Sequence, residues 1–275
     1  MADSMKLSVL MSVYHKESPE FLRQSLESVA AQTVQPDEVV MVKDGPVGAE
    51  LDAVIGTRCG KTPVVTVQLA INVGLGPALN AGLGRCEGDL IARMDSDDIC
   101  LPDRFEKQLA FLEQHPDADV VGGAIGEFHS DPARILSIRR MPCSAELLGR
   151  MARRRNPLNH MTVMFRKSSV LAAGSYQSCP GFEDYDLWAR MLMSGMRLYN
   201  LHDVLVQVRC GNGMQRRRGG FAYLRAETAL QHHFMKTGFL SKRQFLLNVL
   251  ARAPIRVTPP GFRTAFYRWV LRQSL

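Results

Sequence analysis

The chain has 275 residues, of which 46% are hydrophobic and 22% charged, and this composition fits one large globular domain with room for an appendage. Its first residues lack the charged-then-apolar layout of a secretion signal, and no apolar run approaches the roughly 18 residues of a membrane span, so we expect neither export nor a membrane-crossing helix. The six cysteines are scattered without a C-x-x-C pair, which argues against a zinc site and fits a reducing cytosol.

The net charge of +7 is unevenly distributed along the chain. From Val206 onward there are thirteen Lys and Arg residues and one acid, Glu227, so this part carries +12 and the remainder −5. A basic tail on a mildly acidic body indicates an anionic partner such as phosphate groups, a lipid surface or nucleic acid. The alternative is a charged face that only contacts solvent.

Strands and helices alternate in the N-terminal half. The apolar, β-branched runs predict buried strands. Ser18 as N-cap and Pro19 at the first helical position mark the start of a helix. The expected strands are 6–14, 37–45, 63–70 and 89–95, and the expected helices are 18–32, 72–83 and 104–114. This alternation predicts an α/β fold with a largely parallel sheet and helices on both faces.

The pattern is mixed beyond about residue 125. We expect a strand and a short helix within 162–174, an amphipathic helix at 182–195 and a strand at 203–211. The tail is expected to be mostly helical, with a break at the Pro-Pro-Gly of 257–261. We therefore divide the chain into an α/β domain at 1–218 and a basic helical C-terminal extension at 219–275.

Three polar positions follow the predicted parallel strands. Tyr14, Asp44 and Asp95 each stand at the carboxyl end of a strand. In such sheets ligands bind beyond the carboxyl ends of the strands. We expect these side chains to meet at one edge of the sheet.

The segment "MDSDD" places Asp95, Asp97 and Asp98 within four residues. Aspartates cap helix N-termini, but one helix requires one cap. Carboxylates at a sheet edge also hold a divalent cation, Mg²⁺ or Mn²⁺, that keeps coordination positions for substrate phosphates. Such an ion neutralises charge on a departing diphosphate, so the segment predicts a nucleoside diphosphate leaving group.

Three other sites of similar appearance are excluded. In "GLGPAL", Leu79 stands where the dinucleotide fingerprint requires its third glycine. An EF-hand starting at "MDSDD" would have Cys100 in place of the obligatory glycine and Ile99 in place of a ligand. The chain also contains no GxxxxGK[ST] phosphate loop.

Five segments occur in a fixed order, namely "SVLMSVYHKESPEFLRQSLESVAAQT", "DEVVMVKDGP", "NVGLGPALNAGL", "ARMDSDDICLPDRFEKQ" and "GFEDYDLWARML". In series they resemble the family 2 glycosyltransferases of bacterial capsule, exopolysaccharide and O-antigen synthesis, over about residues 6–218. The resemblance implies a GT-A fold, a Rossmann-like mixed but mainly parallel sheet flanked by helices. It also implies a metal-dependent, inverting transfer of one sugar from a nucleotide sugar, which we expect to be a UDP-sugar.

The resemblance assigns roles residue by residue. The implied nucleotide-sugar-binding residues are Ser12, Val13, Tyr14, Glu17, Asp44, Asn72, Gly74, Asp95, Asp97, Arg216 and Arg217. The implied metal ligands are Asp95, Asp97 and Asp98, and how ribose contact and metal ligation divide among them stays open. The arginines would clamp the diphosphate, because guanidinium groups match phosphate oxygens.

Asp184 matches the family's Glu-Asp motif and is the implied catalytic base. Inversion requires a base on the face opposite the leaving group, which takes the proton of the attacking hydroxyl. Glu183 and Asp186 are acidic neighbours that would raise its proton affinity. The alternative is that these acids only charge the start of a helix.

Two residues are candidates for contact with the acceptor, His160 and Glu183. His160 lies in the loop "NPLNH" before a predicted strand, a region that faces the acceptor in the family. A lone histidine can equally serve as a structural hydrogen-bonding residue.

The chain departs from the family at three places. Arg209 and Cys210 occupy a region where a histidine often ligates the metal, so the third ligand stays open. The Q-x-x-R-W of processive enzymes is absent, which argues against a chain-extending synthase. Leu79 stands where the family frequently has an arginine.

The tail contains "FRTAFYRWVLRQ" at 262–273, which mixes basic and aromatic residues in one amphipathic segment. This composition fits an interfacial membrane helix. Nucleic-acid binding would use the same charge, but no recognised module accompanies it, so we expect no nucleic-acid partner. We expect a cytoplasmic enzyme, peripheral at the cytoplasmic face of the membrane, with a lipid-linked oligosaccharide as acceptor.

Two functions compete with glycosyl transfer. A nucleotidyltransferase would use a metal at a similar sheet and release pyrophosphate, but "SVYHKESPE" is not the glycine-rich loop expected over a triphosphate. A non-catalytic membrane- or nucleic-acid-binding module would leave the acidic motifs without a role.

Overall fold

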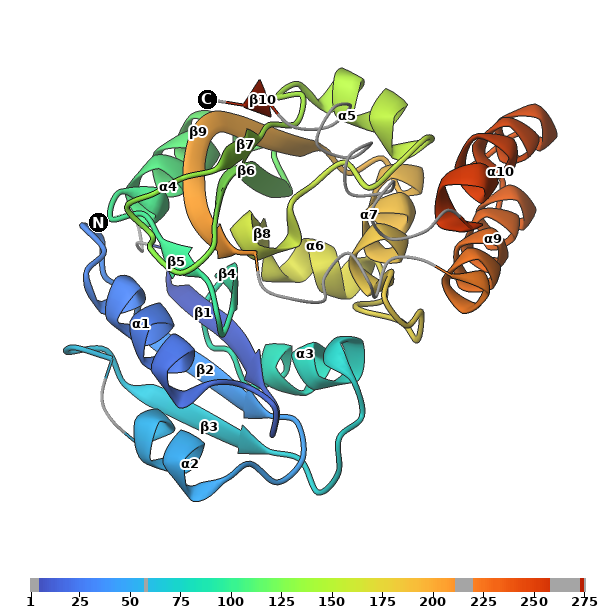
Figure 1. Ribbon diagram of the computed structural model, residues 1–275. Coiled ribbons are helices and arrows are strands. Elements are labelled where there is room, and N and C mark those ends of the chain that lie inside the picture. The colour runs from blue at the N-terminus through green and yellow to red at the C-terminus, as the bar shows by residue number, and fades with distance from the viewer. Residues whose placement is uncertain (1–4, 57–58, 211–219, 258–272, 275) are drawn as a thin grey trace.

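A computed structural model describes residues 5–56, 59–210, 220–257 and 273–274. The fold is one curled sheet with helices on both faces (Figure 1), which confirms the predicted α/β class. The strands are β1 (Leu7–Val13), β2 (Glu38–Lys43), β3 (Val64–Gln68), β4 (Leu90–Asp95), β5 (Ile99–Cys100), β6 (Val120–Phe128), β7 (Ser137–Arg139), β8 (Met164–Arg166), β9 (Leu198–Arg209) and β10 (Gln273–Ser274). The helices are α1 (Pro19–Ala30), α2 (Ala49–Ile55), α3 (Leu75–Leu83), α4 (Arg104–Gln114), α5 (Ala145–Ala152), the 3-10 helix η1 (His160–Thr162), α6 (Lys167–Ala172), α7 (Glu183–Met193), α9 (Phe221–Lys236) and α10 (Lys242–Val257).

The parallel part of the sheet has the order β3-β2-β1-β4. Its central strands are apolar and buried on both faces, as parallel strands covered by helices are. Ser12 of β1 pairs with Val42 on one side and with Asp95 on the other. The carboxyl ends of these strands therefore share one edge, and Tyr14, Asp44 and Asp95 lie there as expected.

The rest of the sheet is mixed. Strand β8 runs antiparallel to β4 and β6, whereas β9 runs parallel to β6. The long β9 curves around this end of the molecule (Figure 1), and its register against β6 shifts between Gly122 and Ile125. Its last residues pair antiparallel with β5, the short strand that follows "MDSDD". This pairing brings Arg209 to the acidic segment.

Two cores flank the sheet. One contains apolar residues of α1, α2 and α4, and the other contains residues of α3, α5, α6 and α7. Helix α3 approaches the sheet at Gly82, where a Cβ atom would lie 2.4 Å from Leu10 Cδ1. This close packing holds α3 beside the ligand-binding edge.

The helix starts and ends predicted from the sequence are largely confirmed. Ser18 Oγ accepts a hydrogen bond from Phe21 N at 3.4 Å, and Pro19 is the first residue of α1. Helix α4 has the predicted bounds, and its N-cap position is Asp103. None of the three aspartates of "MDSDD" caps α4, so the capping explanation for them is wrong.

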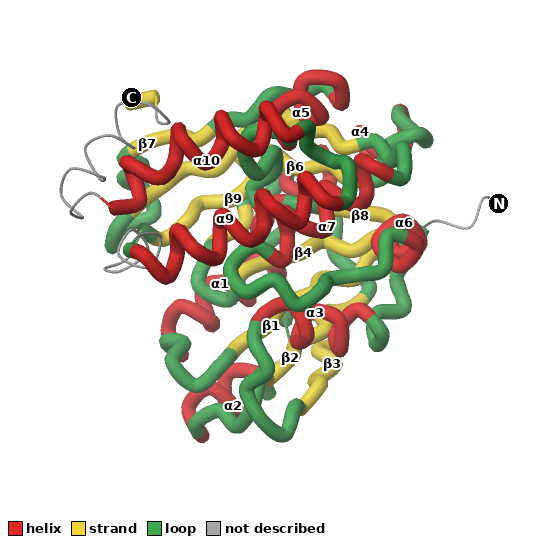
Figure 2. Tube along the Cα trace, turned by 90° about the vertical axis from the view of Figure 1, so that its right-hand side faces the viewer, coloured by secondary structure: helices red, strands yellow, loops and turns green. Residues whose placement is uncertain are grey.

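Helix α9 packs on α7, and α10 lies beside α9 (Figure 2). Phe234 of α9 meets Tyr185 of α7 edge to face, with ring centroids 5.0 Å apart. Asn248 of α10 donates hydrogen bonds to Arg153 O and Gln231 Oε1, both at 2.8 Å. Helix α9 therefore shares a core with the element that starts at Glu183, and Asn248 joins α10 to α9.

Some predictions fall outside the described residues. These are the break at 257–261, all but the last residue of the segment 262–273, and the candidate phosphate-binding residues Arg216 and Arg217. Within the described part of the chain, every helix is too short or too polar to cross a membrane.

Candidate active site

The acidic segment forms a compact oxygen cluster at the end of β4. Single carboxylate oxygens of Asp95, Asp97 and Asp98 all lie within 4.8 Å of one another. Hard divalent cations prefer oxygen ligands of this kind, so the donor set fits Mg²⁺ or Mn²⁺.

Arg209 holds this segment in place from β9. Its backbone N–H donates to Asp98 Oδ1 at 3.0 Å, and its Nε–H donates to the carbonyl oxygen of Asp97 at 3.3 Å. The guanidinium group also donates to Gln24 Oε1 at 2.7 Å and lies 3.9 Å from the ring centroid of Phe21. Arg209 offers no metal ligand, but it ties the acidic segment to α1 and β9.

The carboxyl groups of the cluster disfavour each other's ionisation. Burial, followed by the charges of Asp95 and Glu17, raises the pKa of Asp97 to about 7. Burial and the charges of Asp95 and Asp97 raise the pKa of Asp98 well above its usual range. A divalent cation would offset this repulsion, which is an independent reason to regard the cluster as a metal site.

Glu17 is tied to the same cluster. Its Oε2 accepts a hydrogen bond from Ser96 Oγ at 2.7 Å, and its Oε1 accepts one from Ser18 N at 2.9 Å. The residue expected in the nucleobase pocket therefore borders the acidic cluster in this structure.

Arg93 is a buried cation beneath the cluster. Its side chain projects from β4, is ion-paired with Asp95, and is 2% exposed as a whole residue. Its Nε and Nη1 atoms are buried without a hydrogen-bond partner among the described residues. The ion pair with Asp95 ties this buried charge to the acidic cluster.

Asp44 organises the loop that follows β3. Its Oδ1 accepts from Val73 N at 2.7 Å and its Oδ2 accepts from Gly74 N at 3.1 Å. Asn72 Nδ2 donates to the backbone oxygen of Asp44 at 3.2 Å. The structure thus brings together Asp44, Asn72 and Gly74, and it gives Asp44 a structural task besides the predicted nucleoside contact.

Gly45 makes this close approach possible. Its φ is +86°, in the region that favours glycine, and a Cβ atom would lie 2.7 Å from Asn72 N. The loop containing the predicted nucleotide-binding residues therefore packs directly on the end of β2.

The side chains at the end of β1 differ in their exposure. Val13 is 1% exposed, so its side chain belongs to the core and only its main chain can line a pocket. Tyr14 is 36% exposed, and Ser12 is half-buried next to Asp95 in the strand register. The side chains of Ser12 and Tyr14 remain available for a nucleobase.

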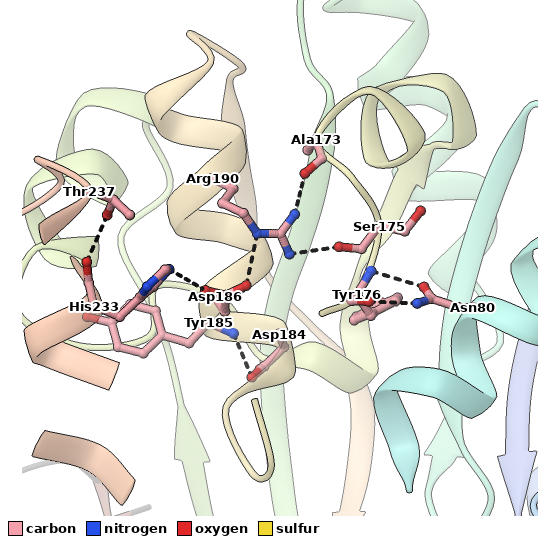
Figure 3. Close-up of polar contacts among 10 residues, drawn as sticks. All are labelled: Asn80, Ala173, Ser175, Tyr176, Asp184, Tyr185, Asp186, Arg190, His233 and Thr237. Carbon is pink, nitrogen blue, oxygen red and sulfur yellow. Dashed lines mark hydrogen bonds and ion pairs between the residues drawn. The ribbon is translucent and has the colours of Figure 1, made fainter. Parts of the chain in front are cut away.

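Asp184 lies in the first turn of α7 (Figure 3). Its Oδ1 accepts from Tyr185 N at 2.7 Å, as Figure 3 shows. Its Oδ2 accepts from Asn156 Nδ2 at 2.6 Å. These two hydrogen bonds orient the carboxylate. Asn156, in the loop before η1, was not predicted from the sequence.

The start of α7 is anchored by a buried ion pair. Arg190 Nε donates to Asp186 Oδ2 at 2.9 Å, and the same guanidinium group donates to the carbonyl oxygens of Ala173 and Ser175 (Figure 3). Asp186 therefore positions the helix and the loop after α6, while its neighbour Asp184 faces Asn156.

Glu183 is half-buried beside α3. A Cβ atom on Gly76 would lie 3.0 Å from Glu183 Cγ, so the glycine provides the space for this side chain. Burial raises the pKa of Glu183, although backbone hydrogen bonds act in the opposite direction. Glu183 lies next to the candidate base, but its contact with an acceptor stays a prediction.

His160 is a half-buried residue that is hydrogen-bonded within the protein. Its Nε2 lies 2.9 Å from Tyr176 Oη, and its ring meets Trp188 edge-on. Asn80 holds the backbone of Tyr176 through both ends of its side-chain amide, because Nδ2 donates to Tyr176 O and Oδ1 accepts from Tyr176 N (Figure 3). Burial and the charge of Arg93 lower the pKa of His160 well below its usual value. These contacts match the structural alternative, and a role toward the acceptor stays a prediction.

Comparisons with known proteins identify the family. Residues 8–174 match the family described as Glycosyl transferase family 2. The chain is 45% identical over 255 residues to the amylovoran biosynthesis glycosyltransferase AmsE of Erwinia amylovora, covering 91% of this chain and 95% of AmsE. It is 37% identical over 273 residues to the Escherichia coli UDP-Gal:alpha-D-GlcNAc-diphosphoundecaprenol beta-1,3-galactosyltransferase, covering 99% of each chain.

Solved structures show the same fold. Staphylococcus aureus TarS in complex with UDP-GlcNAc superposes with a TM-score of 0.65 at 20% identity, covering 84% of this chain and 67% of that one. The mannosyltransferase PcManGT of Pyrobaculum calidifontis, in complex with GDP-Man and Mn²⁺, has a TM-score of 0.63 at 16% identity and covers 100% of this chain and 77% of that one. The sheet, the acidic cluster and these matches agree with the predicted GT-A fold, and the chain belongs to glycosyltransferase family 2.

Proposed function

We propose that this glycosyltransferase moves one sugar, with inversion, from a UDP-sugar to a hydroxyl group of a lipid-linked oligosaccharide in surface-polysaccharide synthesis. The observation that carries the proposal is the acidic cluster at the end of β4, in which single carboxylate oxygens of Asp95, Asp97 and Asp98 lie within 4.8 Å of one another. Such a cluster suits a cation that binds the diphosphate of a nucleotide sugar. The name of the E. coli relative, which states a UDP-sugar donor and a diphosphoundecaprenol-linked acceptor, supports this choice of substrates.

Asp95, Asp97 and Asp98 would hold the divalent cation, Mg²⁺ or Mn²⁺. When bound, the cation supplies positive charge to the diphosphate leaving group. Arg209 would keep two ligands of the cation in position through its hydrogen bonds to Asp97 and Asp98.

Asp184 would accept the proton of the acceptor hydroxyl as that oxygen attacks the anomeric carbon of the donor. Its two oxygens are oriented by Asn156 and by Tyr185 N. The attack comes from the face opposite the leaving diphosphate, so the product has the inverted configuration.

The donor site would extend along the edge of the sheet. Its proposed residues are Ser12, the main chain of Val13, Tyr14, Glu17, Asp44, Asn72, Gly74, Arg216 and Arg217. His160 and Glu183 are proposed on the acceptor side. Exposed apolar side chains at the edge, Tyr14 at 36% and Val73 at 43%, support a site for a flat nucleobase there.

We further propose a cytoplasmic location, peripheral at the membrane, since the acceptor is lipid-linked. The basic helices of residues 219–275 would contact the membrane, and residues 1–218 would contain the catalytic domain. Support comes from the exposed basic residues of α9 and α10, which are considered below.

A donor screen tests the function. Nucleotide sugars are compared for thermal stabilisation of the protein with and without Mg²⁺ or Mn²⁺, because a ligand that binds only the folded state raises the unfolding temperature. We expect a UDP-sugar to stabilise the protein in a cation-dependent manner and transfer to release UDP. Release of pyrophosphate would instead support nucleotidyl transfer and contradict the proposal.

A further inference from the structure

Helix α10 exposes an apolar ridge. Leu246, Leu247 and Leu250 are 56%, 55% and 59% exposed, and their spacing places them on one face of the helix. Ala251 and Pro254 are exposed on the same face. The opposite face is buried against α9 through Asn248. Contiguous exposed leucines on a folded helix mark a surface that contacts another apolar phase.

The charge around this ridge has one sign. Residues 221–257 contain a single acid, Glu227, which is 7% exposed. It is ion-paired with Arg252 at 3.4 Å and with Arg256 at 2.8 Å. The exposed charged residues of the two helices are therefore all basic, namely Arg225, Lys236, Lys242 and Arg243.

We infer that the outer face of α9 and α10 binds a bilayer that contains anionic lipids. Leu246, Leu247 and Leu250 would enter the boundary between headgroups and acyl chains, and the lysines and arginines around them would contact the lipid phosphates. A second copy of the chain fits less well, because two such faces would bring like charges together. A nucleic acid would leave the leucines without an apolar partner.

Helix α9, which forms part of this face, packs on the helix that contains the candidate base. His233 of α9 lies 3.8 Å from Asp186 of α7, and Phe234 packs on Tyr185 of the same helix. Figures 1 and 2 show α9 and α10 lying beside α7. Because Asp184 precedes these residues in α7, a bilayer on this face would lie on the side of the molecule that contains the base.

The inference deepens the proposed function and rests on it for the reason why a membrane is bound, namely a lipid-linked acceptor. It also changes which segment makes the contact. The sequence pointed to 262–273, whereas the structure supports the described face of α9 and α10, led by the leucines of α10.

The test is flotation of the full-length protein with vesicles of phosphatidylcholine alone and of equimolar phosphatidylcholine and phosphatidylglycerol. We expect binding to the anionic vesicles that weakens with salt. The apolar variant is L246E/L247E/L250E, and the charge variant is K242E/R243E. Each should weaken binding by at least about ten-fold. Each variant removes favourable contacts with an anionic interface and also adds negative charges that the interface repels.

Matched controls separate this face from general effects. Leu171→Glu changes a leucine of α6 that is 49% exposed, and Lys61→Glu with Arg85→Glu reverses two exposed charges elsewhere. These controls should float as the wild type does. All variants should keep their unfolding temperature and their transfer to a water-soluble acceptor, since none changes a residue of the active site.

A second measurement uses the unmodified protein. Hydroxyl-radical labelling of Leu246, Leu247 and Leu250 should decrease on anionic vesicles, while labelling of Leu171 should not change. Any of three results would overturn the inference. The labelling could be equal with and without vesicles, the wild type and both face variants could float equally, or the protein could form a dimer that L246E/L247E/L250E dissociates. If the wild-type protein floats with anionic vesicles but transfers no sugar, the result would count against the proposed function and leave the membrane contact standing.

Discussion

Asp97 lies where three other carboxyl groups, those of Asp95, Asp98 and Glu17, crowd one end of β4. Burial and the charges of Asp95 and Glu17 raise the pKa of Asp97 to about 7 in the protein without a cation. A cation would favour the ionised form.

Replacing Asp97 by Asn should therefore remove the dependence of donor binding on Mg²⁺ or Mn²⁺. Transfer should fall by at least about two orders of magnitude, because the diphosphate loses its counter-charge. The measurement is thermal stabilisation by the donor with and without Mn²⁺, together with turnover. Asp103→Asn, at the start of α4, is the matched control and should behave as the wild type. Persistent Mn²⁺ dependence in the Asp97 variant would rule out its role as a ligand.

His160 gives a prediction for stability against pH. Its pKa lies well below 6.5 in the folded protein, so the folded state favours the neutral ring. Its contribution to the free energy of unfolding is present above pH 6.5 and is lost as the pH falls, because the unfolded chain then binds the extra proton.

His160→Gln keeps a hydrogen-bonding group near Tyr176 but cannot titrate. The difference in unfolding temperature between wild type and variant should therefore shrink as the pH is lowered from about 7.5 to 5. Thermal unfolding of both proteins across this pH range checks the prediction. A difference that is constant with pH would show that the ring is already solvated in the folded protein.

The sequence predicted those site residues whose chemistry is concentrated in short motifs. Asp95, Asp97 and Asp98 were recognisable as a cluster, and Asp184 was recognisable within its motif. Asn156 and Arg209 were not assigned their roles, because their partners are 28 and 111 residues away in the chain. Such long-range contacts leave no local pattern.

At the level of elements, the regular half of the chain was predictable. Strands β1, β2 and β4 and helices α1, α3 and α4 have clear periodicity and punctuation, and all are present. Helix α2 was missed because it has seven residues and no side-chain cap at Gly48. Strand β6 was missed because its Gly122 and Gly123 weaken the strand signal, although its backbone pairs with β9.

Helix α9 is expected to be part of the folded body. Phe234 is 1% exposed between Tyr185 and Phe239, whereas Phe221 on the same helix is 80% exposed. Phe234→Ala should lower the free energy of unfolding by about 3–5 kcal/mol, because it leaves a cavity in this core. Phe221→Ala should change it by less than about 0.5 kcal/mol.

Chemical denaturation of the two variants without lipid gives this comparison. A small effect of Phe234→Ala on the main transition would show that α9 and α10 fold separately from the catalytic body.

For the whole molecule, the structure joins two working parts. The parallel strands supply the acidic cluster and the loop held by Asp44, and α7 contains Asp184, the proposed base. Arg93 of β4 is ion-paired with Asp95, and α9 and α10 extend the second part to a basic, apolar surface. The family resemblance predicted the first arrangement, but the sequence alone could not show that the tail packs on the helix of the base.

Turnover of Asp184→Asn tests the central claim most directly. The variant keeps the size of the side chain and one of its two hydrogen-bond acceptors but cannot take the proton of the acceptor, so turnover should fall by about 10²–10⁴-fold. Cation-dependent stabilisation by the donor should stay at the wild-type level, since the acidic cluster is unchanged. Asp203→Asn, a change at an exposed carboxyl group, is the control. Wild-type turnover in a correctly folded Asp184→Asn protein would contradict the account.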